Sequence, residues 1–208
     1  MTQKHKRDKV PQRKKVDQQI PISQIRPIKL LGPRYYLQHA REYPIFGCWV
    51  QEDWEESGLT PVVVARQQSS DKVLFCLCLV DTLCLGVKDA LTDADISQKK
   101  FVRELPLMCN GAPKKCTVEF AHELIYGAIE FAARYGFQPH PDFSNQFASL
   151  VLDPSDAYPH GHKIKFGRKG KPLYIAGPHE DRQKINQILS TLMRTAGEGK
   201  FDYIVGFE

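Results

Sequence analysis

The chain has 208 residues, of which 42% are hydrophobic and 25% charged, the composition of a soluble globular protein with one hydrophobic core. Its longest apolar run, residues 73–80, is too short to cross a bilayer, and the charged N-terminus lacks the apolar region of a secretory signal. These features argue against a membrane-spanning protein and predict a cytoplasmic one, whose six cysteines are expected to be reduced thiols.

The net charge of +5 is concentrated at one end of the chain. Residues 1–29 hold nine Lys and Arg against two Asp, whereas the remaining residues hold 20 basic and 22 acidic side chains. The first 29 residues also lack a sustained apolar period and contain three prolines, so they are predicted to form a disordered basic tail. Such a tail is either an arm that binds nucleic acid or an acidic partner, or a leader that keeps the protein soluble.

Residues 30–208 are predicted to form a single α+β domain. The most apolar stretch, 73–89, is rich in Val, Leu, Phe and Cys, and we expect it to supply one or two buried core strands. Within it, Asp81 and Thr82 mark either a tight reversal or a bulge. The other elements expected in this half are a short helix at 34–42, strands at 45–50 and 61–67, and a helix at 92–104.

The second half contains the clearest helix, 117–135, whose apolar residues recur at helical spacing. Glu123, Tyr126, Glu130 and Arg134 are expected on its opposite, polar side. A stiff connector at 137–143, a hairpin of strands 163–166 and 171–175, a helix at 178–196 and a strand at 201–205 complete the expected elements. Together they predict a mostly antiparallel sheet with two main helices, 117–135 and 178–196, packed on it.

Several segments resemble a family of uncharacterised bacterial proteins. They are LVDTLCLGVKDA at 79–90, IYGAIE at 125–130, GFQPHPDF at 136–143, FGRKGKP at 166–172 and FDYI at 201–204. The resemblance covers the chain from Tyr35 to the C-terminus and leaves out the basic tail. It implies a bacterial-type intracellular protein and brings with it no activity, ligand or fold.

Four side chains are the best candidates for a hydrolytic site: Asp81, Asp89, His140 and Asp142. Carboxylates and an imidazole held on rigid backbone can bind a divalent cation, which would activate water for attack on a phosphodiester. In the alternative interpretation, Asp81 caps a turn, Lys88 pairs with Asp89, and a backbone carbonyl holds His140.

Two other groups of residues have side chains suited to metal binding or to acid-base catalysis. Cys76 and Cys78 with His160 and His162 could in principle ligate zinc, but the cysteines lie in an apolar run where a thiol simply packs, so no metal or cofactor is assigned. His122 and Tyr126, four residues apart on the long helix, could serve as acid and base, although a helix flank more often carries such residues for packing.

The predicted hairpin carries five cations within nine residues: Lys163, Lys165, Arg168, Lys169 and Lys171. They could grip a phosphate backbone, and nucleic acid is therefore the expected partner of the hairpin and the tail. Lysines on an edge hairpin also prevent aggregation between sheets, and this alternative stays open.

Three functional hypotheses follow, and the residues alone do not decide between catalysis and binding. The first is a noncatalytic nucleic-acid-associated accessory protein that uses the tail and the hairpin. The second is a metal-dependent phosphodiesterase or nuclease that uses the four candidate residues. The third is a protein-interaction module, for which an exposed apolar patch would be the sign.

Overall fold

The computed structural model of the chain describes residues 32–159, 161–162, 164–178 and 180–206. The predicted basic tail, 1–29, lies outside these residues, as do His160 and Lys163. The described residues form an α+β fold, which confirms the predicted class.

A five-stranded antiparallel sheet with the order β4-β3-β2-β1-β5 organises the fold. The central strands β2 (Leu59–Gln67) and β3 (Lys72–Asp81) are almost continuously buried, because helices cover both faces of the sheet. The chain then reverses tightly after Asp81 and returns along β3 as the edge strand β4 (Gly86–Ser97), so the apolar stretch supplies one whole strand and the start of a second. The other two strands are β1 (Ile45–Gln51) and β5 (Pro113–Cys116).

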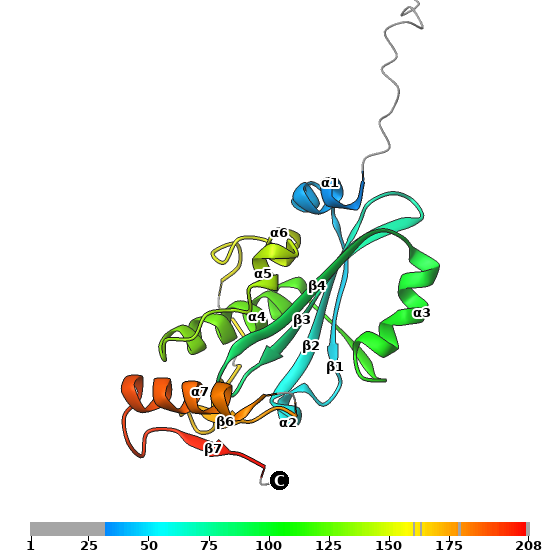
Figure 1. The fold of residues 1–208 in the computed structure, drawn as a ribbon. Helices are drawn as coiled ribbons and strands as arrows, with labels where there is room; N and C mark the ends of the chain where they lie inside the picture. The colour runs from blue at the N-terminus through cyan, green and yellow to red at the C-terminus, as the bar shows by residue number, and fades with distance from the viewer. Residues whose placement is uncertain (1–31, 160, 163, 179, 207–208) are drawn as a thin grey trace, which may run out of the picture. The chain divides into compact units, whose positions relative to one another are not determined.

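Two helices lie on opposite faces of this sheet (Figure 1). Helix α4 (Val118–Ala133) packs on one face; its N-cap Thr117 accepts a hydrogen bond from the backbone N–H of Phe120. Helix α3 (Gln98–Met108) packs on the other, where Phe101 and Leu105 contact the apolar side chains of β2 and β3. The sheet is therefore the middle layer, with a core on each side.

The helix predicted at 92–104 is wrong in its first half. Residues 92–97 continue the ladder with β3, with pairs such as Cys76 with Thr92 and Lys72 with Ser97. Pairing with β3 outweighs the local helix signal, because the backbone N–H and C=O groups of the long, buried β3 would otherwise lose their hydrogen-bonding partners. Helix α3 begins only after Ser97, which caps it, and it continues through Pro106 to Met108.

The predicted hairpin is also wrong. Residues 164–166 form no strand; instead the Phe166 ring packs over Gly127 of α4, and the Gly167 backbone N–H donates to the Thr82 carbonyl at 2.8 Å. Strand β6 (Leu173–Ile175) pairs in parallel with β7 (Asp202–Ile204), and only a single bridge joins Arg168 to Lys171. Contacts with α4 and with the β3–β4 turn therefore hold this segment in place of the predicted strand pairing.

The remaining helices complete the fold around these layers. Helix α7 (Arg182–Thr195) contributes Ile188 and Leu192 to a third apolar cluster with Cys84 and Tyr174, at the turn between β3 and β4. The short ones are α1 (Pro33–Gln38), the 3-10 helix η2 (Ala40–Glu42), α2 (Trp54–Ser57), α5 (Asp142–Asn145) and α6 (Ala148–Val151).

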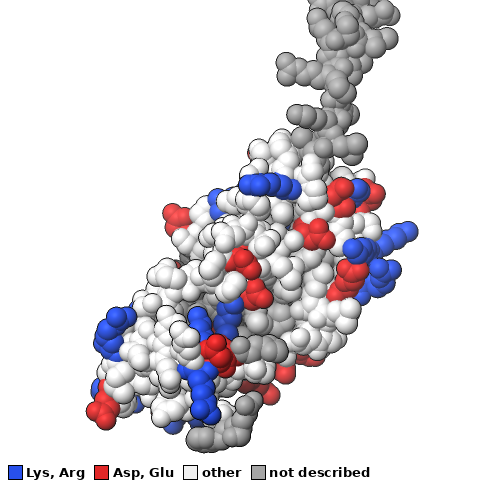
Figure 2. Space-filling model, in the orientation of Figure 1, with Lys and Arg blue, Asp and Glu red and all other residues white. Residues whose placement is uncertain are grey.

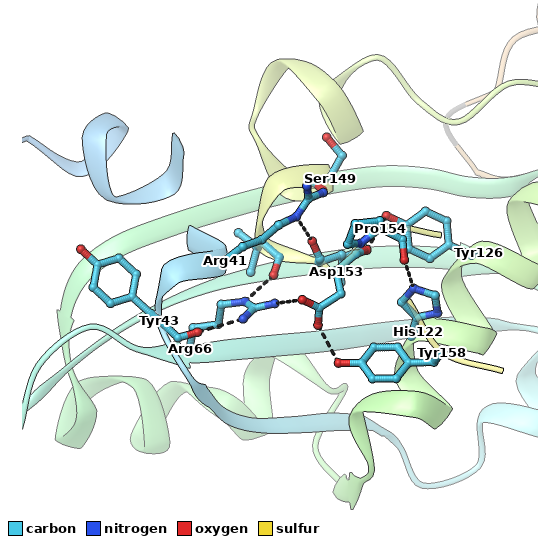
Figure 3. Close-up of polar contacts among 11 residues, drawn as sticks. Arg41, Tyr43, Arg66, His122, Tyr126, Ser149, Asp153, Pro154 and Tyr158 are labelled. Atoms are coloured by element: carbon cyan, nitrogen blue, oxygen red, sulfur yellow. Dashed lines mark hydrogen bonds and ion pairs between the residues drawn. The ribbon is translucent and has the colours of Figure 1, made fainter. Parts of the chain in front are cut away.

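A buried arginine holds the segment after α6 against the sheet (Figure 3). The Arg66 guanidinium, on β2, donates to the Val151 carbonyl at 2.6 Å, the Tyr43 carbonyl at 2.8 Å and the Asp153 carboxylate at 2.9 Å. The Tyr158 hydroxyl donates to the other oxygen of that carboxylate at 2.7 Å. Each charge is thus paired and hydrogen-bonded, as burial requires.

None of the described helices has both the length and the apolar character needed to cross a membrane. The six cysteines are free thiols; five are buried and Cys116 is half-buried. Burial raises the pKa of Cys109 to about 11 and that of Cys116 to about 12, so little reactive thiolate forms at neutral pH.

Candidate metal centre

The proline-stiffened connector runs along the free edge of β4. The His140 backbone N–H donates to the Val87 carbonyl at 2.8 Å, which ties the connector to the strand. Asp142 begins α5, and the Thr92 hydroxyl of β4 donates to the Gln146 carbonyl after that helix at 2.5 Å. These bonds hold His140 and Asp142 beside β4.

A bulge in β4 sends its two charged residues in different directions. Leu79 pairs with Asp89 and the next residue, Val80, pairs with Val87, so Lys88 is an extra residue with no partner on β3. The Lys88 ammonium turns toward Glu180 at 2.9 Å, whereas the Asp89 carboxylate is exposed beside the connector. The Lys88–Asp89 pair of the alternative interpretation therefore does not form.

Three of the four predicted hydrolytic residues converge. Asp89, His140 and Asp142 each offer a ligand atom within 4.8 Å of the other two, with the His140 Nδ1 atom 3.8 Å from an Asp89 oxygen and 3.7 Å from an Asp142 oxygen. The His140 Nδ1 atom also accepts a long, 3.3 Å hydrogen bond from the Asp142 backbone N–H. Two carboxylates and one imidazole form a mixed oxygen and nitrogen donor set that can hold a divalent transition-metal cation such as Mn²⁺.

Asp81 does not belong to this group. Its carboxylate is buried, and its oxygens accept the backbone N–H groups of Leu83, Cys84 and Leu85 at 2.8–3.1 Å. Burial raises the pKa of this carboxyl, and the three N–H donors act against that rise. Asp81 therefore caps the β3–β4 turn, as the alternative interpretation expected.

A pocket of about 350 Å³ opens beside the cluster, and His140 belongs to both. Most of its lining is apolar, from the β3–β4 turn, the connector and α7. The lining residues are Leu85, Val87, Lys88, Phe137, Gln138, Pro139, His140, Pro141, Glu180, Lys184 and Ile188.

The Glu180 carboxylate is the most tightly held charge of this pocket. One of its oxygens pairs with Lys88, and the other accepts the Tyr174 hydroxyl at 2.7 Å and the Gly177 N–H at 2.9 Å. Burial alone would raise the pKa of this carboxyl, but the three donors outweigh it and lower the pKa. Sequence patterns did not reveal Glu180 as a partner of Lys88, because 92 positions separate them and only the fold brings them together.

The zinc alternative gains no support among the described residues. Cys76 and Cys78 lie in the apolar core under α4, outside the one group of converging ligands found in the described ranges. The His162 Nδ1 atom lies 3.1 Å from a Glu123 oxygen, which also accepts the backbone N–H groups of Gly161 and His162. Glu123 is therefore buried, which corrects its predicted place on a polar helix side.

The acid-base alternative on α4 is also accounted for by packing. His122 is 3% exposed, and its Nε2 atom donates to the Pro154 carbonyl at 2.7 Å, while the Tyr126 hydroxyl donates to the Asp153 carbonyl at 3.1 Å (Figure 3). Both side chains thus hold the segment after α6 in place.

The predicted cationic residues lie in a loop that we call the basic loop, residues 165–171. Lys165, Arg168, Lys169 and Lys171 are exposed, and none pairs with a carboxylate among the residues that the structure describes. The loop is fixed to the β3–β4 turn by the Gly167 N–H bond to Thr82 and by a 3.1 Å bond from the Leu173 N–H to the Leu83 carbonyl. Because Leu85 of the same turn lines the pocket, the loop and the pocket share one support.

No protein-family model, curated protein or solved structure matches this chain. The resemblance to an uncharacterised bacterial family therefore stays a prediction.

Proposed function

We propose that the chain binds a divalent cation at Asp89, His140 and Asp142 and uses it to hydrolyse a phosphodiester in the cytoplasm. The observation that carries the proposal is the convergence of these three ligand atoms within 4.8 Å at the side of a pocket. Each residue comes from the β4 edge or from the connector tied to it, so the cluster rests on rigid backbone.

In the proposed reaction the water oxygen bonds to phosphorus and one ester P–O bond breaks. One water proton passes to solvent as the new P–O bond forms, and the departing alkoxide takes a proton from solvent, so no oxidant or further reactant is needed. Asp89, His140 and Asp142 would hold the cation, which would make water more acidic and offset negative charge on the phosphate.

The test is hydrolysis of bis(p-nitrophenyl) phosphate by the purified full chain with Mn²⁺. We expect turnover that is lost on adding EDTA and falls at least tenfold in Asp142→Asn, since a metal ligand is lost. Asp93→Asn is the control, because Asp93 is an exposed carboxylate of the same strand outside the cluster. An equal rate in Asp142→Asn and in the unaltered protein would contradict the proposal.

A second candidate function is noncatalytic association with nucleic acid through the basic loop. It is supported by the four exposed cations of that loop, whose charges are not neutralised by any described carboxylate. Binding and hydrolysis are compatible, since the β3–β4 turn that anchors the basic loop also lines the pocket beside the proposed cation site.

The third hypothesis, a protein-interaction module, is favoured by one feature of the C-terminal strands. Ile175, Tyr203 and Ile204 are 42–58% exposed on the two-stranded β6–β7 sheet. Single exposed apolar residues are common on protein surfaces, so these three weigh less than a converging ligand group.

A further inference from the structure

The pocket beside the candidate metal cluster has a mainly apolar lining that also includes charged side chains. Apolar surface comes from the β3–β4 turn, β4, the connector and α7, through Leu85, Val87, Phe137 and Ile188 respectively. A volume of about 350 Å³ lies at the small end of the range for ligand pockets, roughly 300–1,000 Å³. The pocket therefore suits a compact organic group about the size of one aromatic ring with a substituent.

The charges of the lining favour an anion. The pocket's lining residues include two lysines, Lys88 and Lys184, against one acidic residue, Glu180. Glu180 is already held by Lys88, Tyr174 and the Gly177 N–H, so it has little capacity left for a ligand's donors. Lys184 is exposed and pairs with no carboxylate of the described ranges.

His140 connects this interior to the cation. Its ring contributes to the pocket wall and also belongs to the three-residue cluster. A phosphate bound to a cation at the cluster would therefore lie beside the pocket, with the pocket within reach of its organic substituent.

On these grounds we infer that the pocket binds the aromatic group of an organic phosphate, whose phosphate lies between the cation at Asp89, His140 and Asp142 and the Lys184 ammonium. The inference rests on the proposed cation site and adds the class of substrate: a small phosphate ester with an aromatic or heteroaromatic group.

The test compares phenylphosphonate with methylphosphonate, two stable probes that share the anionic group and differ in the apolar one. Binding to the full chain is measured by calorimetry after saturation with Mn²⁺, whose own binding is titrated first. We expect phenylphosphonate to bind at least tenfold more tightly, because its ring leaves water for the apolar interior.

Two variants locate the binding site. Lys184→Gln is expected to weaken the binding of both probes by at least threefold and to keep the preference for the phenyl group. The control is Lys114→Gln, because Lys114 is exposed on β5 at the other edge of the sheet, and it is expected to leave both affinities unchanged. Ile188→Phe is expected to reduce the phenyl preference by filling the interior. Lys184 is exposed, so its replacement tests the inference even if Ile188→Phe fails to fold.

Each other outcome has a distinct meaning. Normal Mn²⁺ binding with equal affinity for the two probes, or with affinity for neither, would overturn the inference and leave the cation site standing. Absence of Mn²⁺ binding would overturn both the proposed function and the inference that depends on it.

Discussion

Lys88 and Asp89 show how one bulge gives two adjacent charges opposite environments. In a regular strand, neighbouring side chains point to opposite faces, but a bulge near the start of β4 interrupts this alternation. The extra residue lets Lys88 reach a half-buried carboxylate while Asp89 stays in solvent beside the connector. The sequence identified both residues as charges set in an apolar stretch but could not predict the bulge that separates them.

The Glu180 carboxylate gives the molecule a specific dependence on pH. Hydrogen bonds from Tyr174, the Gly177 N–H and Lys88 hold its pKa below the ordinary 4.5. The ionised form is therefore favoured by folding, and its contribution to stability is full above pH 4.5 and is lost as the pH falls through the lowered pKa.

We expect Glu180→Gln to lower the free energy of unfolding at pH 7 and to flatten its decline between about pH 5 and pH 3. Urea unfolding at a series of pH values measures both effects. Asp153 and Glu123 also have lowered pKa values, but they are present in both proteins and cancel in the difference. Parallel pH curves for the two proteins would show that Glu180 is not held as described.

At the scale of elements, the sequence predicted the long helix and the buried strands because their apolar periods agree with their packing. Helix 117–135 was observed as Val118–Ala133 with Thr117 as its cap, and helix 178–196 as Arg182–Thr195 with Asp181 as its cap. The errors at 92–97 and 164–166 have a common cause. Pairing with β3 decides the conformation of 92–97, and packing of Phe166 on α4 decides that of 164–166. The local sequence pattern of each segment does not reveal these contacts.

The same reason limits what could be predicted of the site. Proline spacing correctly indicated a non-helical connector at 137–140, but its predicted extent to 143 is wrong, because Asp142 and Phe143 belong to helix α5. Asp81 was grouped with the site residues because a carboxylate in an apolar run needs a partner, but three backbone N–H groups of its own turn satisfy it. Asp89 lies close to His140 and Asp142 only because the connector runs along the edge of β4, and that contact is tertiary.

The contact between Gly127 and Phe166 fixes the basic loop on α4. A Cβ at position 127 would lie 2.6 Å from the Phe166 ring, too close without movement of the ring. Gly127→Ala is therefore expected to destabilise the protein by about 1–2 kcal/mol, despite the better helix propensity of alanine.

A double-mutant cycle isolates this contact. In a Phe166→Ala background, Gly127→Ala is expected to stabilise the protein by about 0.5–1 kcal/mol, since only the propensity remains. Chemical unfolding of the four proteins gives the coupling. The same sign of the Gly127→Ala effect in both backgrounds would contradict the described packing.

At the scale of the whole molecule, charge is not gathered into one field over the face drawn in Figure 2. Lysine and arginine side chains alternate there with aspartate and glutamate, and much of the face is uncharged. This agrees with 20 basic and 22 acidic residues after position 29. Any binding of nucleic acid by the folded part must therefore come from a local group of cations such as the basic loop.

Replacement of Lys165, Arg168, Lys169 and Lys171 by glutamine tests that role. If all four contact phosphates, the dependence of log K on log salt concentration for a single-stranded oligonucleotide should become shallower by about 3. Fluorescence anisotropy at several salt concentrations measures the slope. The matched control replaces four exposed lysines elsewhere, Lys99, Lys100, Lys114 and Lys115, and equal slopes for the two variants would refute a specific role of the loop.

The central claim is that Asp89, His140 and Asp142 hold one divalent cation, and calorimetric titration with Mn²⁺ tests it most directly. We compare the unaltered protein with Asp89→Asn and with Asp93→Asn, a matched control because both carboxylates accept the following backbone N–H at 2.8 Å. We predict one Mn²⁺ per chain for the unaltered protein and the control, and at least tenfold weaker binding for Asp89→Asn. Equal Mn²⁺ affinity in all three proteins, or no Mn²⁺ binding by any of them, would contradict the claim.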